Sequence, residues 1–197
     1  MHMQEHDTGP DPTAILFGSA ISAVTLGLGY TSFGIVTTMI FAAGFVGGLF
    51  LWLALPTRAS WQDIKAPYWL ALLLFAVHRI EENVSGFFQK LSEITAEQIP
   101  SLASPSLILL VLISVGCWLS IPVLMAKRYS IGSYFAWTFF ASMGLTELAH
   151  ILVFPFFDSG TNLYFPGMAS VFLLAPIGWW GMWRLSKGRR NTSEQTG

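Results

Sequence analysis

The chain has few charged residues and one cysteine. Asp, Glu, Lys and Arg make up 11% of its 197 residues, whereas soluble domains carry about 25%. The formal net charge of −1 excludes a basic nucleic-acid-binding surface. The lone Cys117 excludes an intramolecular disulfide. The first dozen residues lack Lys and Arg, so no cleavable signal peptide is expected.

Apolar residues, by contrast, make up 53% of the chain and form long runs. A membrane-spanning helix needs about 20 mostly apolar residues. Six runs approach this length, at about 12–29, 35–55, 67–91, 106–125, 131–157 and 164–185. We therefore predict an all-α integral membrane protein, a bundle of about six transmembrane helices. A single transmembrane domain at 12–186 is expected between a polar tail at 1–11 and a basic, polar tail at 187–197.

Basic residues fall in alternate connections between these runs. They are Arg58 and Lys65, Lys127 and Arg128, and after the sixth run Arg184, Lys187, Arg189 and Arg190. The opposite connections hold Lys90, Glu93, Glu97 and Asp158. Lys and Arg mark the cytoplasmic side of membrane proteins, so both termini are predicted to be cytoplasmic.

Ionisable residues inside two of the apolar runs are the main indication of function. They are His78, Arg79, Glu81 and Glu82 in the third run, and Glu147 and His150 in the fifth. Each charge at mid-membrane costs roughly 2.5–3.5 kcal/mol on insertion scales. At 1.5 Å per residue, His78 to Asn83 lie about 16–24 Å into their span, and Glu147 and His150 lie about 24–29 Å into theirs. Both groups are therefore expected at similar depth, in the outer half of the bilayer.

These side chains favour a metal site. With neutral imidazoles the cluster has a net charge of −2, which protons or a divalent cation must neutralise. Mixed imidazole and carboxylate ligands suit Zn or Fe(II). We predict His78, Glu81 and His150 as metal ligands, with Glu82 and Glu147 as candidate general bases. A structural polar network, with Arg79 paired to Glu82, is the alternative.

Three motifs give a family resemblance. His78-Arg-Ile-Glu81-Glu82 resembles the signature of the bacterial HXXEE membrane family, whose function is unassigned. Thr146-Glu-Leu-Ala-His150 is similar to that family's Asn-x-x-x-His motif, with Thr in place of Asn. Tyr164-Phe-Pro-Gly167 matches its Tyr-x-Pro-Gly motif. The resemblance covers about 67–183 and implies a location in the bacterial cytoplasmic membrane. Tyr164 is a candidate catalytic phenol, or else an aromatic residue at the membrane interface.

Three functions follow from these patterns. The leading hypothesis is a metal-dependent enzyme that acts on a lipid-phase or isoprenoid-like substrate. The second is a metal-free isomerase or cyclase in which Glu and His move protons. The third is a non-enzymatic subunit that binds a ligand or cofactor. The expected partners are the lipid bilayer and a lipid-like small molecule, with an oligomer or larger membrane complex left open.

Overall fold

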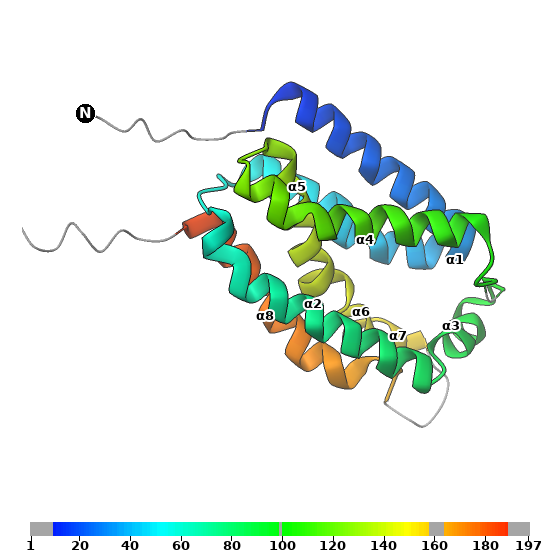
Figure 1. Ribbon diagram of the computed structural model, residues 1–197. Coiled ribbons are helices and arrows are strands. Elements are labelled where there is room, and N and C mark those ends of the chain that lie inside the picture. The colour runs from blue at the N-terminus through cyan, green and yellow to red at the C-terminus, as the bar shows by residue number, and fades with distance from the viewer. Residues whose placement is uncertain (1–9, 99, 158–163, 189–197) are drawn as a thin grey trace, which may run out of the picture.

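The computed structural model describes residues 10–98, 100–157 and 164–188, and this part of the chain contains helices and no strand (Figure 1). The predicted all-α class is confirmed for these residues. The outer parts of both predicted tails, Asp158, Arg189 and Arg190 lie outside them. The helices are α1 (Pro12–Ala54), α2 (Trp61–Val84), α3 (Phe87–Thr95), α4 (Pro105–Ala126), α5 (Ser130–Ala141), η1 (Ser142–Thr146), α6 (Ala149–Leu152), α7 (Phe154–Phe157) and α8 (Met168–Lys187).

Helix α1 is a hairpin of two arms. Gly34 interrupts it with φ 72° and ψ −175°, a backbone conformation that glycine adopts at low cost. The chain then reverses, so that Ser22 Oγ donates to the Phe45 carbonyl at 3.4 Å. Figure 1 shows the two arms, blue and cyan, running in opposite directions. The turn predicted at residues 30–34 thus appears as a break within one helical element.

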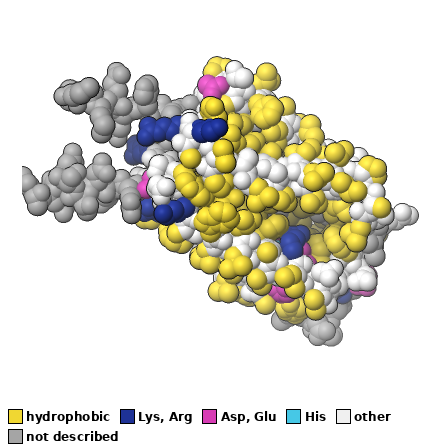
Figure 2. Space-filling model, in the orientation of Figure 1, with side chains coloured by type: hydrophobic (Ala, Val, Ile, Leu, Met, Phe, Trp, Pro, Cys, Tyr) yellow, Lys and Arg dark blue, Asp and Glu magenta, His cyan; other side chains and the backbone are white. Residues whose placement is uncertain are grey.

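Three segments are long and apolar enough to cross a membrane: Pro12–Ala54, Pro105–Ala126 and Ser130–Phe157. Hydrophobic side chains also cover much of the surface (Figure 2), as expected for contact with lipid. These features indicate a membrane protein. Helices α2 and α8 are not among the three segments, and the number of six spans stays a prediction.

Helix α2 differs from the predicted third run. It begins at Trp61, where the Asp63 carboxylate accepts hydrogen bonds from Ser60 N at 2.9 Å and Ser60 Oγ at 2.8 Å. It ends at Val84 rather than at residue 91, because Gly86 in a left-handed conformation (φ 75°) turns the chain into α3. The end of α2 at Val84 is not evident from the sequence, because Phe87, Phe88 and Leu91 continue the apolar run.

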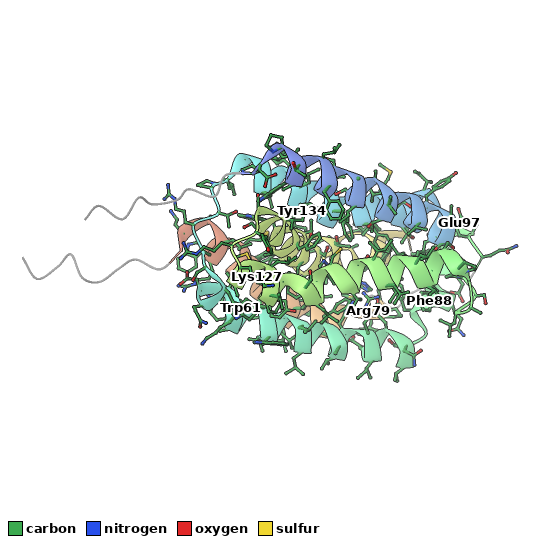
Figure 3. The ribbon with its side chains drawn as sticks, turned by 45° about the horizontal axis from the view of Figure 1, so that its top comes forward. Trp61, Arg79, Phe88, Glu97, Lys127 and Tyr134 are labelled. Atoms are coloured by element: carbon green, nitrogen blue, oxygen red, sulfur yellow. The ribbon has the colours of Figure 1, made fainter. Side chains whose placement is uncertain are left out.

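Helices α2 and α8 pack side by side, and the start of α2 meets the last turns of α8 at the end of the bundle where both described termini lie (Figure 1). Arg184 Nε donates to the Asp63 carbonyl at 3.1 Å, and Arg58 N donates to the Leu185 carbonyl at 3.0 Å. Figure 2 shows Lys and Arg side chains gathered at this end. Figure 3 places Trp61 and Lys127 toward it, and Phe88 and Glu97 toward the other end. We call them the basic end and the outer end.

Helix α5 runs through the middle of the bundle, and residues 132–141 are all buried. Small residues let its neighbours approach closely. A Cβ on Gly48 of α1 would lie 2.6 Å from the Thr138 Cα, and one on Gly178 of α8 would lie 2.6 Å from the Gly144 backbone nitrogen. Close contacts at small residues are typical of membrane helices. They hold the segment after α5 firmly against α1 and α8.

Candidate metal centre

A turn of π-helix, η1, follows α5 and leads to the site. In this turn the Gly144 carbonyl accepts a hydrogen bond from Trp179 Nε1 at 2.7 Å. Glu147 comes directly after η1, and His150 lies in α6. Both side chains are buried. Single π-turns inside α-helices occur frequently at functional sites.

Two residues of α2 meet these two side chains. The described group that could hold a metal ion consists of His78, Glu82, Glu147 and His150, each with one ligand atom within 4.8 Å of the others. His78 Nε2 lies 3.1 Å from Glu147 Oε2 and 3.4 Å from Glu82 Oε1. His150 Nε2 lies 3.3 Å from Glu82 Oε1 and 3.4 Å from Glu147 Oε2. The two ionisable groups expected at similar depth therefore converge.

The other ring nitrogens fix the tautomers of the histidines. His150 Nδ1 is hydrogen-bonded to the Pro166 carbonyl, which can only accept, so Nδ1 carries the proton. His78 Nδ1 lies 2.8 Å from Ser170 Oγ, whose hydroxyl donates to the Gly167 carbonyl at 3.1 Å. Ser170 Oγ therefore accepts from His78 Nδ1. Metal-binding histidines commonly donate their second ring N–H to a protein oxygen in this way.

Both Nε2 atoms consequently carry lone pairs when the imidazoles are neutral. These lone pairs face the carboxylate oxygens of Glu82 and Glu147, so four acceptors point at one another. Glu82 Oε1 is buried and has no hydrogen-bond partner among the described residues. A buried charged oxygen without a donor is costly. Either protons on Nε2 or a shared cation must compensate this arrangement.

Arg79 holds both carboxylates from their other side. Its Nη1 lies 2.8 Å from Glu82 Oε2, and its Nη2 donates to Glu147 Oε1 at 3.1 Å. The expected pairing of Arg79 with Glu82 is present, and Glu147 shares it. Each carboxylate thus gives one oxygen to Arg79 and turns the other toward the histidines. This arrangement orients the two carboxylates like a pair of ligands.

Glu81 and Tyr164 lie apart from this group. Glu81 accepts hydrogen bonds from Ala169 N at 3.0 Å, Ser170 N at 2.8 Å and the Tyr164 hydroxyl. It therefore binds the first turn of α8, where backbone N–H groups have no helical partner. The expectation that Glu81 joins the metal ligands does not agree with this geometry, because Glu82 occupies that place. The expected ion pair of Glu82 does not exclude it from the site, since its two oxygens face different neighbours.

The structure adds residues that the sequence did not identify as parts of the site. Gly167 has φ 94°, and a Cβ there would lie 2.6 Å from His150 Nδ1 and 2.7 Å from His78 Cε1. Pro166 and Ser170 fix the imidazoles as described. Pro166 and Gly167 belong to the Tyr-x-Pro-Gly motif, and this motif was the sequence feature that could have identified them. The motif forms a turn that contacts both histidines.

Aromatic rings surround His150. The ring centroids of Phe87, Phe154 and Phe165 lie 5.2, 5.4 and 5.8 Å from its ring, and all three Phe side chains are buried. They come from α3, α7 and the turn before α8. This apolar shell keeps the local dielectric low, which strengthens electrostatic interactions inside the group.

Comparison with known families agrees with the motifs. The family model described as "Protein of unknown function with HXXEE motif" matches residues 69–181, more than half of the chain. The chain therefore belongs to the HXXEE family. The match includes every residue of the site and excludes α1. No curated protein and no solved structure matches the chain.

Proposed function

We propose that His78, Glu82, Glu147 and His150 bind one divalent cation inside the membrane, and that the protein is a metal-dependent enzyme with a lipid-phase substrate. The observation that carries the proposal is Glu82 Oε1, a buried oxygen without a described donor that lies 3.4 Å from His78 Nε2 and 3.3 Å from His150 Nε2. A cation at this point would satisfy all four acceptors.

The spacing of the acceptors supports this proposal. Ligands bonded at about 2.0–2.2 Å to one ion lie about 2.8–3.1 Å apart at right angles and about 3.3–3.6 Å apart at tetrahedral angles. The four measured N···O distances run from 3.1 to 3.4 Å. Charge supports it as well. Arg79, Glu82 and Glu147 sum to −1 with neutral histidines, so the group favours a bound cation.

The identity of the metal bears on catalysis. A tetrahedral Zn ion would have all its positions filled by these four residues, as in structural zinc sites. An octahedral ion such as Fe(II) would keep positions open for water or substrate. We therefore favour Fe(II) over Zn for an enzyme.

Elemental analysis of the detergent-purified protein tests the metal. We expect one divalent ion per chain in the parent and a near-complete loss in His78→Ala and Glu82→Gln. Glu93→Gln is the matched control, because Glu93 is an exposed carboxylate paired with Lys90 in α3, and it should retain the ion. A parent protein without metal after purification in metal-supplemented buffer would reject the proposal.

A proton-transfer site is the second candidate. The same N···O distances suit hydrogen bonds from protonated Nε2 atoms to Glu82 and Glu147, and an isomerase or cyclase could use such protons. Nitrogen NMR of labelled histidine separates the two, because protonated and metal-bound Nε2 have different chemical shifts. Protonated rings in a metal-free protein would favour this candidate.

The proposed topology has six crossings with both termini in the cytoplasm. The two arms of α1 would make the first two crossings, and α2, α4, the segment 130–157 and α8 the others. The gathering of Lys and Arg at the basic end supports this orientation. The candidate metal centre then lies toward the outer leaflet of the cytoplasmic membrane.

A further inference from the structure

Arg79 is the point where the buried charged group reaches the molecular surface. Its side chain is 44% exposed, whereas those of Glu82 and Glu147 are 6% and 8% exposed. Its guanidinium lies over the Phe75 ring, 4.8 Å from the centroid. Figure 3 labels Arg79 between α2 and α4. Anything that approaches the candidate metal centre along this side meets Arg79 first.

The guanidinium has donors to spare. It carries five N–H groups, and its two ion pairs use one on Nη1 and one on Nη2. No other described residue accepts a hydrogen bond from it. Three N–H groups therefore remain on a side chain that is 44% exposed.

The surroundings of these donors are apolar. Helices α2 and α4 both carry exposed hydrophobic residues, among them Val77, Ile80, Val84, Val111 and Leu112. Figure 2 shows a basic side chain with acidic atoms beside it, enclosed by hydrophobic surface. Toward the basic end, α2 and α4 are joined where Phe75 packs on Trp118 with ring centroids 5.7 Å apart. Beyond that contact the two ribbons diverge (Figure 1).

The depth of Arg79 limits what can meet these donors. Arg79 is about 18 Å along α2 from Pro67, where the apolar run begins, and the hydrocarbon core is about 30 Å thick. Its guanidinium pairs with Glu82, one turn nearer the outer leaflet, which brings it within reach of the outer head groups. Hydrocarbon offers no acceptor for its N–H groups, whereas a lipid phosphate does. The planar fork of an arginine suits two oxygens of one phosphate.

We infer that Arg79 binds the anionic head group of a membrane lipid at the surface between α2 and α4. The acyl chains of this lipid would lie against the exposed apolar side chains of the two helices. The next step rests on the proposed function. Such a lipid is the substrate class of the enzyme, because the same guanidinium contacts two of the candidate metal ligands. Arg79 would then bring the head group beside the ion.

Lipid retention tests this inference. The protein is placed in nanodiscs with equal amounts of phosphatidylglycerol and phosphatidylcholine of the same acyl chains, and bound lipids are identified by native mass spectrometry. We expect phosphatidylglycerol to be preferred by about fivefold, the ratio for one Arg near an anionic lipid. The preference for this tightly held lipid should disappear in Arg79→Lys, since a compact ammonium group that pairs with both carboxylates has little left for a head group. Lys127→Ala, which removes a charge at the basic end, should keep it.

A second measurement uses the parent protein, so that the inference does not depend on the folding of a variant. A phosphatidylglycerol analogue with a photoreactive head group should cross-link to α2 near Arg79 or to the half of α4 away from the basic end. Cross-links confined to the basic end would overturn the inference. Equal retention of both lipids would do the same. Displacement of the lipid by inorganic phosphate would assign the donors to a soluble oxyanion instead.

Metal content is measured on the same samples. Loss of the lipid preference with the ion retained refutes only the lipid site, and absence of the ion with the preference retained refutes only the proposed metal centre. Arg79→Lys is expected to retain the ion, because a cation still faces the carboxylates. The two proposals can therefore fail separately.

Discussion

Glu81 and Glu82 are adjacent in α2, but their carboxylates have different partners. Glu81 accepts hydrogen bonds from the first turn of α8 and from Tyr164. Glu82 lies between His78, Arg79 and His150, and its Oε1 has no described donor. Successive residues of a helix point about 100° apart. Adjacent glutamates can therefore contact two different parts of the protein. The first holds a helix in place, and the second completes the charged group.

This relationship predicts different results for the two conservative changes. Glu82→Gln should abolish metal binding, because an amide is a much weaker ligand than a carboxylate. Glu81→Gln should retain the ion but lower the free energy of unfolding by about 1–3 kcal/mol, since hydrogen bonds to a charged group are lost. Elemental analysis and thermal unfolding in detergent measure both effects. Metal loss in Glu81→Gln with full retention in Glu82→Gln would reverse the assignment.

Ser170 should influence metal binding without touching the ion. Its hydroxyl oxygen accepts a hydrogen bond from His78 Nδ1. Losing such a partner typically costs about 10–100-fold in metal affinity. We expect Ser170→Ala to fall in this range in chelator competition. Ser186→Ala is the matched control on the same helix, because Ser186 Oγ only donates to the Trp183 carbonyl near the basic end. An unchanged affinity in Ser170→Ala would contradict the described tautomer.

Gly167 should not tolerate a side chain. A left-handed conformation costs a non-glycine residue about 1–2 kcal/mol, and the added Cβ would also displace both imidazoles. We expect Gly167→Ala to lower both thermal stability and metal content. Gly116→Ala in α4 offers the comparison, since a Cβ there meets no atom within 4 Å. That variant should be as stable as the parent or slightly more so.

Removal of Arg79 should destabilise the protein. Arg79→Ala leaves two buried carboxylates without their countercharge, and we expect a loss of about 1–3 kcal/mol in the free energy of unfolding. Arg58→Ala removes an equal charge at an exposed position and should have little effect. Added divalent metal should restore part of the stability of Arg79→Ala if the ion binds between the same carboxylates. Equal stability of Arg79→Ala and the parent would remove the role of Arg79 as countercharge.

The topology has its own test. A reporter that is active only outside the cytoplasm should stay silent when it is fused after Lys187. The same reporter inserted near residue 100, at the outer end of the bundle, should be active. Activity in the first position would show that the basic end does not face the cytoplasm and would reject six crossings with cytoplasmic termini.

Several features followed from the sequence alone. Exposing long apolar runs to water is unfavourable, whereas lipid accommodates them. The helical membrane class was therefore readable from composition. The break near Gly34 was readable from turn residues, and the extent of α4 from the length of its apolar run. His78, Glu82, Glu147 and His150 stood out because charged groups in apolar runs are costly unless they have partners. Helical rise also placed both groups at one depth.

Only the tertiary structure decided which side chains meet. The π-turn at Ser142–Thr146 has no clear sequence signal, and it immediately precedes Glu147. The choice between Glu81 and Glu82 depends on where α8 lies, because the N–H groups at its start attract the nearer carboxylate. Pro166, Gly167 and Ser170 also belong to the site because the position of α8 brings them beside the two histidines. Spacing along one helix fixes which residues share a face, whereas the packing of the next helix fixes what each face contacts.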